Sequence, residues 1–500
     1  MSTGVADLVS KAVSSIAQIP RSLFINGEWV EGRGAPFGNR NPATGEIFAQ
    51  ISSATADDAL LALDSAAAAQ RAWRNWAPRR RGNLLLAAHR LMLERAELFA
   101  QVMTLESGKP LSVSRAEFNL SADFFLWFAE QTAHIHGTYA HGSHGGYRVL
   151  VTHQPIGPTL LITPWNFPLL MIVRKGGAAL AAGCTTIVKS AQETPLTGAL
   201  FVKTLQDAGF PTGVVNLLHT TDSSAVADLL LGDFRLRKVS FTGSTRVGSL
   251  LLARGAANVV SSSLELGGDG PFIVLDDADV DRAVEHAIIC KFRNAGQACV
   301  AANRIIVHRS VERQFTEKFL QKTKALRVGN GLADVDVGPM ISEKQRSRLA
   351  ATIADLVAAG GEVLTGGHTI EGPGFFYEPT VVRFDSPNPI MCSNELFAPI
   401  ATIFAVDTLE EALQFANDST FGLASYLFTK DLSRAFSIGE QLEFGMVGIN
   451  RGIMADPGAP FGGTKASGLG REAGQHGIYE FMEPKYLAVT VDEVGGPFAH

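Results

Sequence analysis

Short apolar runs alternate with longer amphipathic stretches between residues 158 and 265. Four runs rich in aliphatic and β-branched residues predict strands at 158–162, 185–189, 213–218 and 238–241. The stretches between and after them predict helices at 169–183, 197–209, 223–231 and 246–257. Strands and helices that alternate in this way predict βαβ units around a parallel sheet.

The same alternation starts again at residue 271. A strand at 271–275, a helix from about 279, a strand at 304–308 and a helix at 311–325 predict a second α/β unit. A chain of 500 residues also exceeds what one hydrophobic core usually supports. The sequence therefore predicts the α/β class and at least two domains.

Two strand-like segments, 140–155 and 486–493, lie outside both alternations. A detached apolar strand has an unpaired edge, which proteins normally cover, often with a second subunit. These segments therefore predict a small β element that takes part in self-association.

The composition is typical of a soluble globular protein, with 46% apolar residues, 18% charged residues and a net charge of −6. There is no basic stripe, so nucleic acid is not an expected partner. No apolar run reaches the roughly 18 residues of a membrane span, so a membrane is not expected either. The first 20 residues contain one basic residue, Lys11, and no compact apolar block. They do not resemble a signal peptide, and we expect a frayed arm.

The cysteines Cys184, Cys290, Cys299 and Cys392 have spacings that fit neither a disulfide framework nor paired zinc ligands. This predicts a reduced, cytoplasmic setting and no bound metal. Cys299 stands among small residues in KFRNAGQACVAANRI. Its thiol is either a buried small hydrophobe or a placed nucleophile.

One predicted strand runs directly into a glycine, two hydroxyl residues and a helix, in FTGSTRVG. Free backbone N–H groups and the macrodipole at a helix N-terminus attract phosphate. Only Gly243 and Gly248 of a dinucleotide fingerprint are present, so a turn without a ligand is the alternative.

Three further motifs carry one polar candidate each. The amide of Asn166, in ITPWNFP, would stabilise an oxyanion or else cap the following helix. The carboxylate of Glu265 lies between leucines in LELGG, where a raised pKa suits a general base; alternatively it lies on the wet face of a strand. Glu395, in SNELFAP, would bind ribose hydroxyls or is an exposed loop residue.

In their order and spacing these motifs resemble the aldehyde dehydrogenase superfamily over essentially the whole chain. The matching stretches are ITPWNFP, FTGST-x-x-G, LELGG, FRNAGQAC, NELFAP and APFGGTKASGLGRE. KFRNAGQACVAANR and HGIYEFMEPKYLAV are most similar to the succinate semialdehyde dehydrogenase branch. The resemblance implies a Rossmann-like cofactor domain at 20–132 and 152–265, a second α/β catalytic domain at 266–475, and oligomerisation strands at 133–151 and 480–495. It also implies a homodimer or homotetramer.

The resemblance implies that Cys299 attacks the aldehyde carbon as thiolate and forms a thiohemiacetal. Its backbone N–H and the amide of Asn166 would hold the oxyanion. Hydride transfer to nicotinamide would leave a thioester, which water activated by Glu265 would hydrolyse without a metal. The small neighbours Gly296 and Ala298 would leave room around the thiol. Members that form acyl-CoA usually lack this glutamate, so release of the free acid is expected.

The resemblance also implies a nicotinamide dinucleotide cofactor. The adenosine ribose would lie against Lys189, the pyrophosphate at Gly243 and Ser244, and the nicotinamide ribose at Glu395. Gln192 stands where members that prefer NAD carry a glutamate that repels a 2′-phosphate, so NADP is expected to be accepted alongside NAD or preferred to it. Further cofactor contacts are implied at Thr163, Pro164, Trp165, Gly248 and Phe397.

Arg174 and Arg293 match two arginines with which the succinate semialdehyde branch holds the distal carboxylate, so succinate semialdehyde is the leading expectation. The branch's serine is replaced by Ala455, which removes a hydrogen bond of about 1 kcal/mol and leaves more room. Glutarate semialdehyde, 2-oxoglutarate semialdehyde or an aromatic aldehyde are the alternatives. One or both arginines would otherwise pair with internal acids and only brace the tunnel.

Two other classes of function fit parts of the sequence. Some relatives of the family serve as structural proteins, but these tend to lose the nucleophile or base, and Asn166, Glu265 and Cys299 are all present. A cysteine hydrolase without a cofactor would need a histidine paired with the thiol, and no histidine lies in these motifs.

Overall fold

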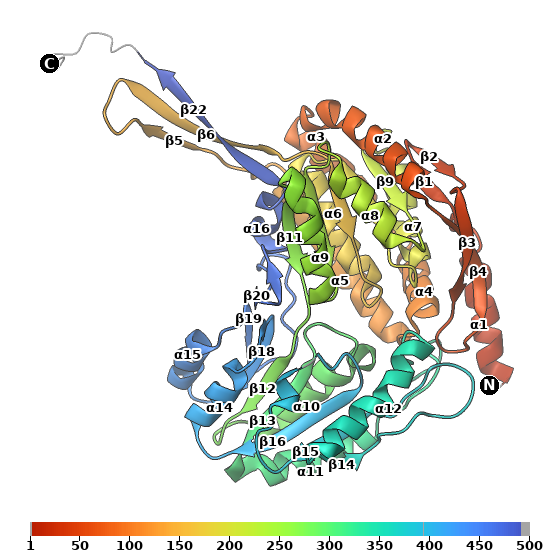
Figure 1. Cartoon of the computed structure of the whole chain (residues 1–500), viewed down its shortest axis with the longest axis vertical. Helices are drawn as coiled ribbons and strands as arrows, with labels where there is room; N and C mark the ends of the chain where they lie inside the picture. The colour runs from red at the N-terminus through yellow and green to blue at the C-terminus, as the bar shows by residue number, and fades with distance from the viewer. Residues whose placement is uncertain (1–2, 394, 492–500) are drawn as a thin grey trace.

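The structure is a computed structural model that describes residues 3–393 and 395–491. It contains two large sheets, each covered by helices, and a three-stranded sheet that projects from the body (Figure 1). The predicted α/β class is therefore confirmed. Within the described part of the chain, no helix is both long and apolar enough to cross a membrane.

The first sheet contains the alternation predicted between residues 158 and 265. Its five central strands are parallel: β9 (Val215–Leu218), β8 (Thr186–Lys189), β7 (Thr159–Ile162), β10 (Lys238–Thr242) and β11 (Ser261–Glu265). Antiparallel strands complete its edges, namely β1 (Leu23–Ile25), β2 (Glu28–Val30) and β21 (Gly468–Leu469). The predicted helices are present as α6 (Pro168–Ala182), α7 (Pro195–Asp207), α8 (Ser223–Gly232) and α9 (Thr245–Gly255). Gly183 closes α6 in the left-handed conformation, at φ +98°.

The register of the parallel strands brings the motifs ITPWNFP, FTGSTRVG and LELGG together at the carboxyl ends of these strands. Ile162 lies opposite both Lys189 and Phe241, and Thr242 lies opposite Glu265. Because parallel strands end on the same side, the loops after β7, β8 and β10 meet there. Ligands of α/β sheets bind outside these carboxyl ends.

The second sheet is parallel apart from one edge strand. Its order is β14 (Glu362–Thr365), β15 (Thr380–Phe384), β16 (Ile400–Val406), β13 (Ala302–His308), β12 (Gly270–Val274), β18 (Ala424–Phe428) and β19 (Met446–Ile449), with β14 antiparallel. Its helices include α10 (Val280–Phe292), α11 (Arg309–Lys324), α12 (Glu343–Ala358), α14 (Leu409–Asn417) and α15 (Leu432–Gln441). The elements predicted after residue 270 are therefore confirmed. β21 returns from late in the chain to the first sheet, and the predicted domain boundaries stay a prediction.

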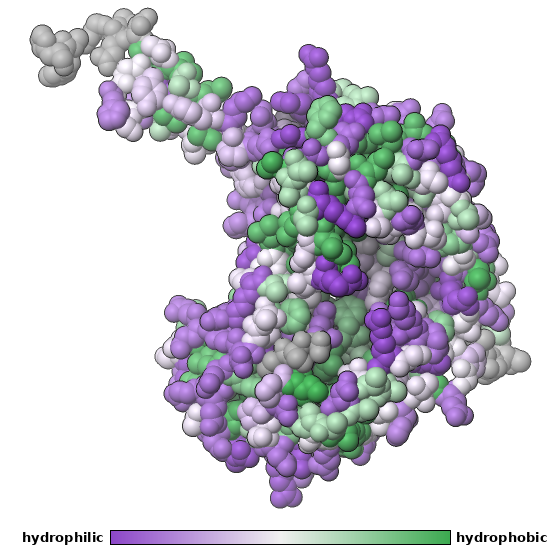
Figure 2. All heavy atoms as spheres, viewed as in Figure 1, coloured by the Kyte–Doolittle hydropathy of each residue, from purple (hydrophilic) through white to green (hydrophobic). Residues whose placement is uncertain are grey.

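The projecting arm is an antiparallel sheet in the order β22 (Met482–Thr490), β6 (Tyr147–Pro155) and β5 (Thr138–His141). The segment 140–155, expected to be strand-like, forms the end of β5, a turn and the whole of β6. The predicted strand at 486–493 falls largely within β22, and its last two residues lie outside the described residues. Figure 2 shows pale and green residues mixed along the arm. Tyr139 is 65% exposed and Tyr486 56%.

The N-terminal segment is not the frayed arm that the sequence led us to expect. Residues Thr3–Ser15 form helix α1, and Ala12, Ile16 and Ile19 are buried in the main hydrophobic core. The Ser15 hydroxyl donates to Gln101 Oε1 at 2.6 Å, which ties α1 to α4. This segment is therefore ordered by its apolar contacts with α4, a helix that is distant in the sequence. The helices that follow are α2 (Ala56–Arg74), α3 (Pro78–Glu94), α4 (Ala96–Ser107) and α5 (Leu111–Gln131), after a hairpin of β3 (Gly34–Arg40) and β4 (Ile47–Ser53).

Candidate active site

Three cavities adjoin one another between the carboxyl edge of the first sheet and the loops of the second. The first, of about 480 Å³, is called the sheet-edge cavity, and the second, of about 230 Å³, the central cavity. These two share Pro164, Trp165, Thr242, Gly243 and Ser244 in their walls. The third, of about 250 Å³, is called the arginine cavity, and it shares Cys299 with the central cavity. The thiol therefore lies where the last two cavities meet.

The sheet-edge cavity lies over the ends of β7, β8 and β10. Most of the predicted cofactor residues line it: Thr163, Pro164, Trp165, Lys189, Gln192, Gly243 and Ser244. Ser244 is the N-cap of α9, and its hydroxyl accepts a hydrogen bond from the Val247 N–H at 3.4 Å. Gly248 packs behind this turn, where an added Cβ would lie 2.5 Å from Leu266 Cδ2. Its contribution is close packing of α9.

The donor set of this cavity fits a dinucleotide. The amino end of α9 opens toward it, and backbone N–H groups at a helix start bind phosphate. The Thr242 hydroxyl is buried without a hydrogen-bond partner among the described residues, so it is available to a ligand. Burial lowers the pKa of Lys189, partly offset by Glu193, and a bound anion would favour its charged form. A Cβ on Gly243 would lie 2.4 Å from the Phe241 ring, so a larger residue there would have to displace that ring.

The central cavity brings together Asn166, Cys299, Glu395 and Phe397, which the sequence reasoning selected separately. Glu395 Oε1 accepts a hydrogen bond from the Gly268 N–H at 3.2 Å, and burial raises the pKa of Glu395 to about 7. Glu395 is therefore half-buried and fixed, unlike an exposed loop glutamate. The rings of Phe397 and Trp165 meet edge to face, with centroids 5.5 Å apart.

The loop that carries Cys299 is fixed by backbone contacts. The Val300 carbonyl accepts from the Tyr426 hydroxyl at 2.6 Å and from Cys290 Sγ at 3.5 Å. Gly296 has φ +70°, and its Cβ would lie 2.0 Å from the Ala398 carbonyl oxygen. Backbone geometry therefore requires this glycine, and its expected part in leaving room at the thiol stays a prediction.

The thiol itself is partly exposed to the two cavities. Burial among protein atoms raises the pKa of Cys299 to about 12, while the charge of Arg174 opposes the shift. The thiol is consequently protonated at neutral pH, and an attack on an electrophile requires removal of its proton.

Asn166 does not cap the helix that follows it. Helix α6 begins at Pro168, and its free N–H groups at Leu169 and Leu170 donate to Glu117 Oε1 at 3.0 and 3.2 Å. The Asn166 amide instead donates to the Gln297 carbonyl at 3.1 Å, beside the Cys299 loop. Its Oδ1 is buried without a partner among the described residues. The Asn166 side chain therefore faces the loop that carries Cys299, and both residues line the central cavity.

Glu265 is buried on β11 but lines neither cavity that contains the thiol. Burial raises its pKa well above the usual value, and the neighbouring charge of Glu472 raises it further. Its Oε2 has no hydrogen-bond partner among the described residues. The position on a wet strand face is excluded, and contact with a water near Cys299 would need a movement of the side chain.

The arginine cavity contains both predicted arginines and Ala455. Arg174 Nε lies 2.9 Å from Glu472 Oε2, and its guanidinium lies 3.9 Å from the centroid of the Phe461 ring. The guanidinium carbon of Arg293 lies 5.3 Å from the centroid of the Phe167 ring, and Arg293 makes no ion pair within residues 3–393 and 395–491. One arginine is thus paired with an internal acid, and the other is available to an anion.

The sequence reasoning missed several residues that line the cavities. Gln345, in the first turn of α12, contributes to the central cavity, and Ser112 and Phe461 contribute to the arginine cavity. Gln345 and Ser112 lie outside the quoted motifs, and Phe461 lies within APFGGTKASGLGRE but has no distinctive chemistry. No local signal therefore marked them. No cluster of three or more histidine, cysteine or acidic side chains suited to a metal occurs in the described ranges.

A sequence model of the aldehyde dehydrogenase family matches residues 29–487. The chain is 43% identical to the NADP(+) succinate-semialdehyde dehydrogenase of Escherichia coli over 471 residues, which are 94% of this chain and 98% of that protein. It is 43% identical to the glutarate-semialdehyde dehydrogenase of Pseudomonas putida, over 94% of this chain and 98% of that protein. The solved structure of succinate-semialdehyde dehydrogenase from Burkholderia pseudomallei superposes with a TM-score of 0.92 at 40% identity, covering 95% of this chain and 98% of that one.

Proposed function

This chain belongs to the aldehyde dehydrogenase family and is an NAD(P)-dependent oxidoreductase, and from that premise we propose that it oxidises succinate semialdehyde to succinate. One observation carries the proposal. Cys299 stands at the junction of the central cavity and the arginine cavity, so its thiol can meet a nicotinamide from one side and an anionic aldehyde from the other.

In the proposed reaction, Cys299 releases its thiol proton to water and adds as thiolate to the aldehyde carbon, and the Asn166 amide donates to the oxygen that becomes negative. Oxyanion donors of this kind typically contribute the largest single part of catalysis. A nicotinamide held in the central cavity would supply the hydride acceptor, and loss of hydride from the Cys299 adduct would give a thioester on this residue. Glu265, whose pKa is raised by burial and by Glu472, would then turn its side chain toward Cys299 and take a proton from the water that releases the acid.

We propose that the dinucleotide occupies the sheet-edge cavity with its nicotinamide end in the central cavity. Lys189 and Gln192 would lie at the adenosine ribose, Gly243 and Ser244 at the pyrophosphate, and Glu395 at the nicotinamide ribose. Gln192 is neutral and exposed, so it presents no carboxylate to a 2′-phosphate. NADP is therefore the preferred cofactor in this proposal, consistent with the NADP(+) enzyme of Escherichia coli.

For the substrate, the arginine cavity favours an aldehyde with a carboxylate at its far end. Arg293 offers a guanidinium that has no ion-pair partner in the described part of the chain, in an otherwise largely apolar space, which is suited to bidentate contact with a carboxylate. Ala455 leaves room where a hydroxyl would otherwise stand. Glutarate semialdehyde, one methylene longer, is the second candidate, as in the relative from Pseudomonas putida.

We further propose that the arm formed by β5, β6 and β22 joins subunits in a homodimer or homotetramer. The arm projects from the body (Figure 1). Large apolar side chains on it are exposed, including Tyr139, Tyr486, Leu487 and Val489. Such side chains on an unpaired sheet edge are normally covered by a partner.

The test is NADPH formation by the purified protein with NADP and succinate semialdehyde, run beside glutarate semialdehyde and an uncharged aldehyde. We expect the highest kcat/KM for a carboxylate-bearing aldehyde and none for Cys299→Ala, which should still bind NADP. Turnover by Cys299→Ala, or preference for an uncharged aldehyde, would contradict the mechanism or the substrate respectively.

A further inference from the structure

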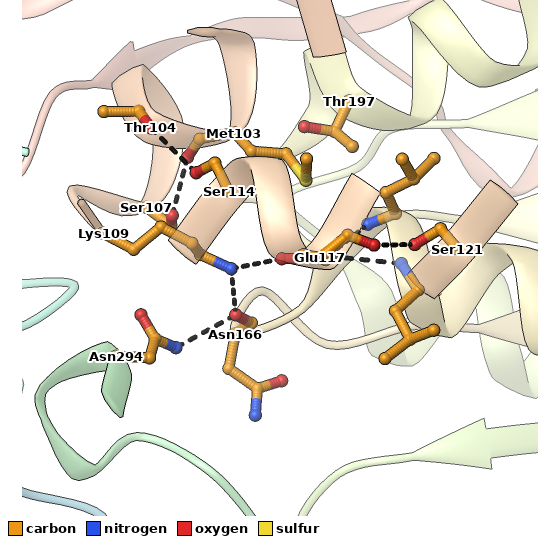
Figure 3. Close-up of polar contacts among 12 residues, drawn as sticks. Met103, Thr104, Ser107, Lys109, Ser114, Glu117, Ser121, Asn166, Thr197 and Asn294 are labelled. Atoms are coloured by element: carbon orange, nitrogen blue, oxygen red, sulfur yellow. Dashed lines mark hydrogen bonds and ion pairs between the residues drawn. The ribbon is translucent and has the colours of Figure 1, made fainter. Parts of the chain in front are cut away.

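A fully buried ion pair stands directly behind Asn166 (Figure 3). The Lys109 ammonium lies 2.5 Å from Glu117 Oε2, and both side chains are 0% exposed. The same ammonium donates to the Asn166 backbone carbonyl at 2.6 Å. The Asn294 amide donates to this carbonyl as well, at 3.0 Å. Two donors from different segments therefore fix one peptide oxygen.

Glu117 fixes the other end of the same turn. Its Oε1 accepts from the N–H groups of Leu169 and Leu170, so the carboxylate provides the cap of α6. The segment from Asn166 to Leu170 is thereby attached at both ends to one pair of charges, one of them on α5. Because the Asn166 side chain extends from this segment, the pair determines where its amide points.

The ion pair also affects the charge on the wall of the arginine cavity. Glu117 forms part of the wall of the arginine cavity, where a bare carboxylate would repel an anionic substrate. Lys109 and the two N–H groups of α6 neutralise it. A buried ion pair is a costly way to stabilise a fold, and a well-packed apolar pair is often as stable. An apolar pair, however, could not donate a hydrogen bond to the Asn166 carbonyl, as Lys109 does.

We propose that Lys109 and Glu117 are positioning residues for the Asn166 amide. They hold the turn before α6 so that Nδ2 faces the oxygen of the aldehyde bound at Cys299. The inference rests on the proposed role of Asn166 as the oxyanion donor. It extends that role to two residues that touch neither the thiol nor the cofactor in the described contacts.

The test is a double-mutant cycle read by the pre-steady-state burst of NADPH, which reports the steps up to hydride transfer. We expect Asn166→Ala to slow the burst by about 10²- to 10³-fold, the usual effect of losing one oxyanion donor. Lys109→Met should slow it by about 10-fold or more, on the order of the loss expected when a reacting group is misplaced. The double variant should be no slower than Asn166→Ala alone, and NADP affinity, measured by protein fluorescence, should not change.

Lys238→Met is the matched control, because it removes an equally buried lysine that lies 3.4 Å from Glu480 and opposite Thr159, at the end of β10 and β7 away from the Asn166 turn. Lys238→Met should lower the melting temperature about as much as Lys109→Met does, but it should leave the burst rate unchanged. If Lys109→Met does not fold, Glu117→Gln replaces it, with the same expectation of non-additivity with Asn166→Ala.

Two results separate the inference from the proposed function beneath it. An unchanged burst in Asn166→Ala would overturn the oxyanion role itself. A slow burst in Asn166→Ala together with an unchanged burst in Lys109→Met, or with equal losses from Lys109→Met in both backgrounds, would overturn the positioning role alone.

Discussion

Arg174 is part of the wall of the arginine cavity, and its Nε lies 2.9 Å from the buried carboxylate of Glu472. Lys175 pairs with the other oxygen of the same carboxylate, so Glu472 joins two buried cations. Arg293, in the same cavity, lies over an aromatic ring and makes no ion pair with an acidic side chain among the described residues. The two arginines are therefore not equivalent, and they should respond differently to substitution.

The first prediction is that Arg293→Ala loses efficiency selectively on a carboxylate-bearing aldehyde. A hydrogen bond to a charged group is worth about 1.5–3 kcal/mol, or roughly 10- to 150-fold in kcat/KM. Arg174→Ala should instead lower kcat/KM for charged and uncharged aldehydes alike and reduce the melting temperature, because Glu472 loses a partner. Succinate semialdehyde and butanal form a suitable pair. A selective loss in Arg174→Ala with none in Arg293→Ala would reverse the assignment.

The second prediction concerns Glu265→Gln. The variant should still give a burst of NADPH but little steady turnover, because hydrolysis of the thioester lacks its base. Since burial and Glu472 raise the pKa of Glu265, steady turnover of the wild type should rise with pH above the usual carboxylate range. That ascending limb should disappear in the variant. Absence of the burst as well would place Glu265 earlier, in activation of the thiol.

A third prediction follows from the pKa of Cys299, which burial raises to about 12. In the cofactor-free enzyme, alkylation of Cys299 by iodoacetamide should rise about tenfold per pH unit between pH 7 and 10, because the thiolate fraction does so below the pKa. An ordinary thiol, with a pKa of about 8.5, would level off above pH 9. Mass spectrometry of the modified peptide gives the rate at Cys299 itself. A plateau below pH 9 would show that the cavity stabilises the thiolate.

Local pattern was sufficient to predict four parallel strands of the first sheet with their helices, and β12, β13, α10 and α11 of the second, because each apolar run is bounded by glycine or polar residues that end the element. The later strands and helices of the second sheet were not predicted. It failed at α1, where contacts with α4 order a segment that has no strong local signal. It also did not indicate that Glu265 lies apart from the two cavities holding Cys299, although LELGG and FRNAGQAC both stand in the sequence. Pairing of Arg174 with Glu472 joins residues nearly 300 positions apart, and only the folded chain reveals it.

The fourth prediction tests the choice of cofactor. Gln192→Glu places a carboxylate in the sheet-edge cavity near Lys189, where it would repel a 2′-phosphate and accept a hydrogen bond from a 2′-hydroxyl. The ratio of kcat/KM for NADP to that for NAD should fall by about 10-fold or more, as expected for about 1.4 kcal/mol. Gln192→Ala is the control for loss of the amide. An unchanged ratio in Gln192→Glu would move the discriminating contact elsewhere in the cavity.

The last prediction concerns the width of the arginine cavity at Ala455. Ala455→Ser adds a hydroxyl to the wall that also contains Arg293, so a substrate carboxylate there could accept one more hydrogen bond. A bond worth about 0.5–1.5 kcal/mol corresponds to a gain of roughly 2- to 13-fold in kcat/KM. The gain should be larger for succinate semialdehyde than for glutarate semialdehyde, because the added atom also takes up space that the longer chain needs. Ala116→Ser adds a hydroxyl to the same cavity from α5 and is the matched control for polarity alone. Equal gains from both variants, or a gain with butanal, would mean that the hydroxyl at 455 does not act on the carboxylate.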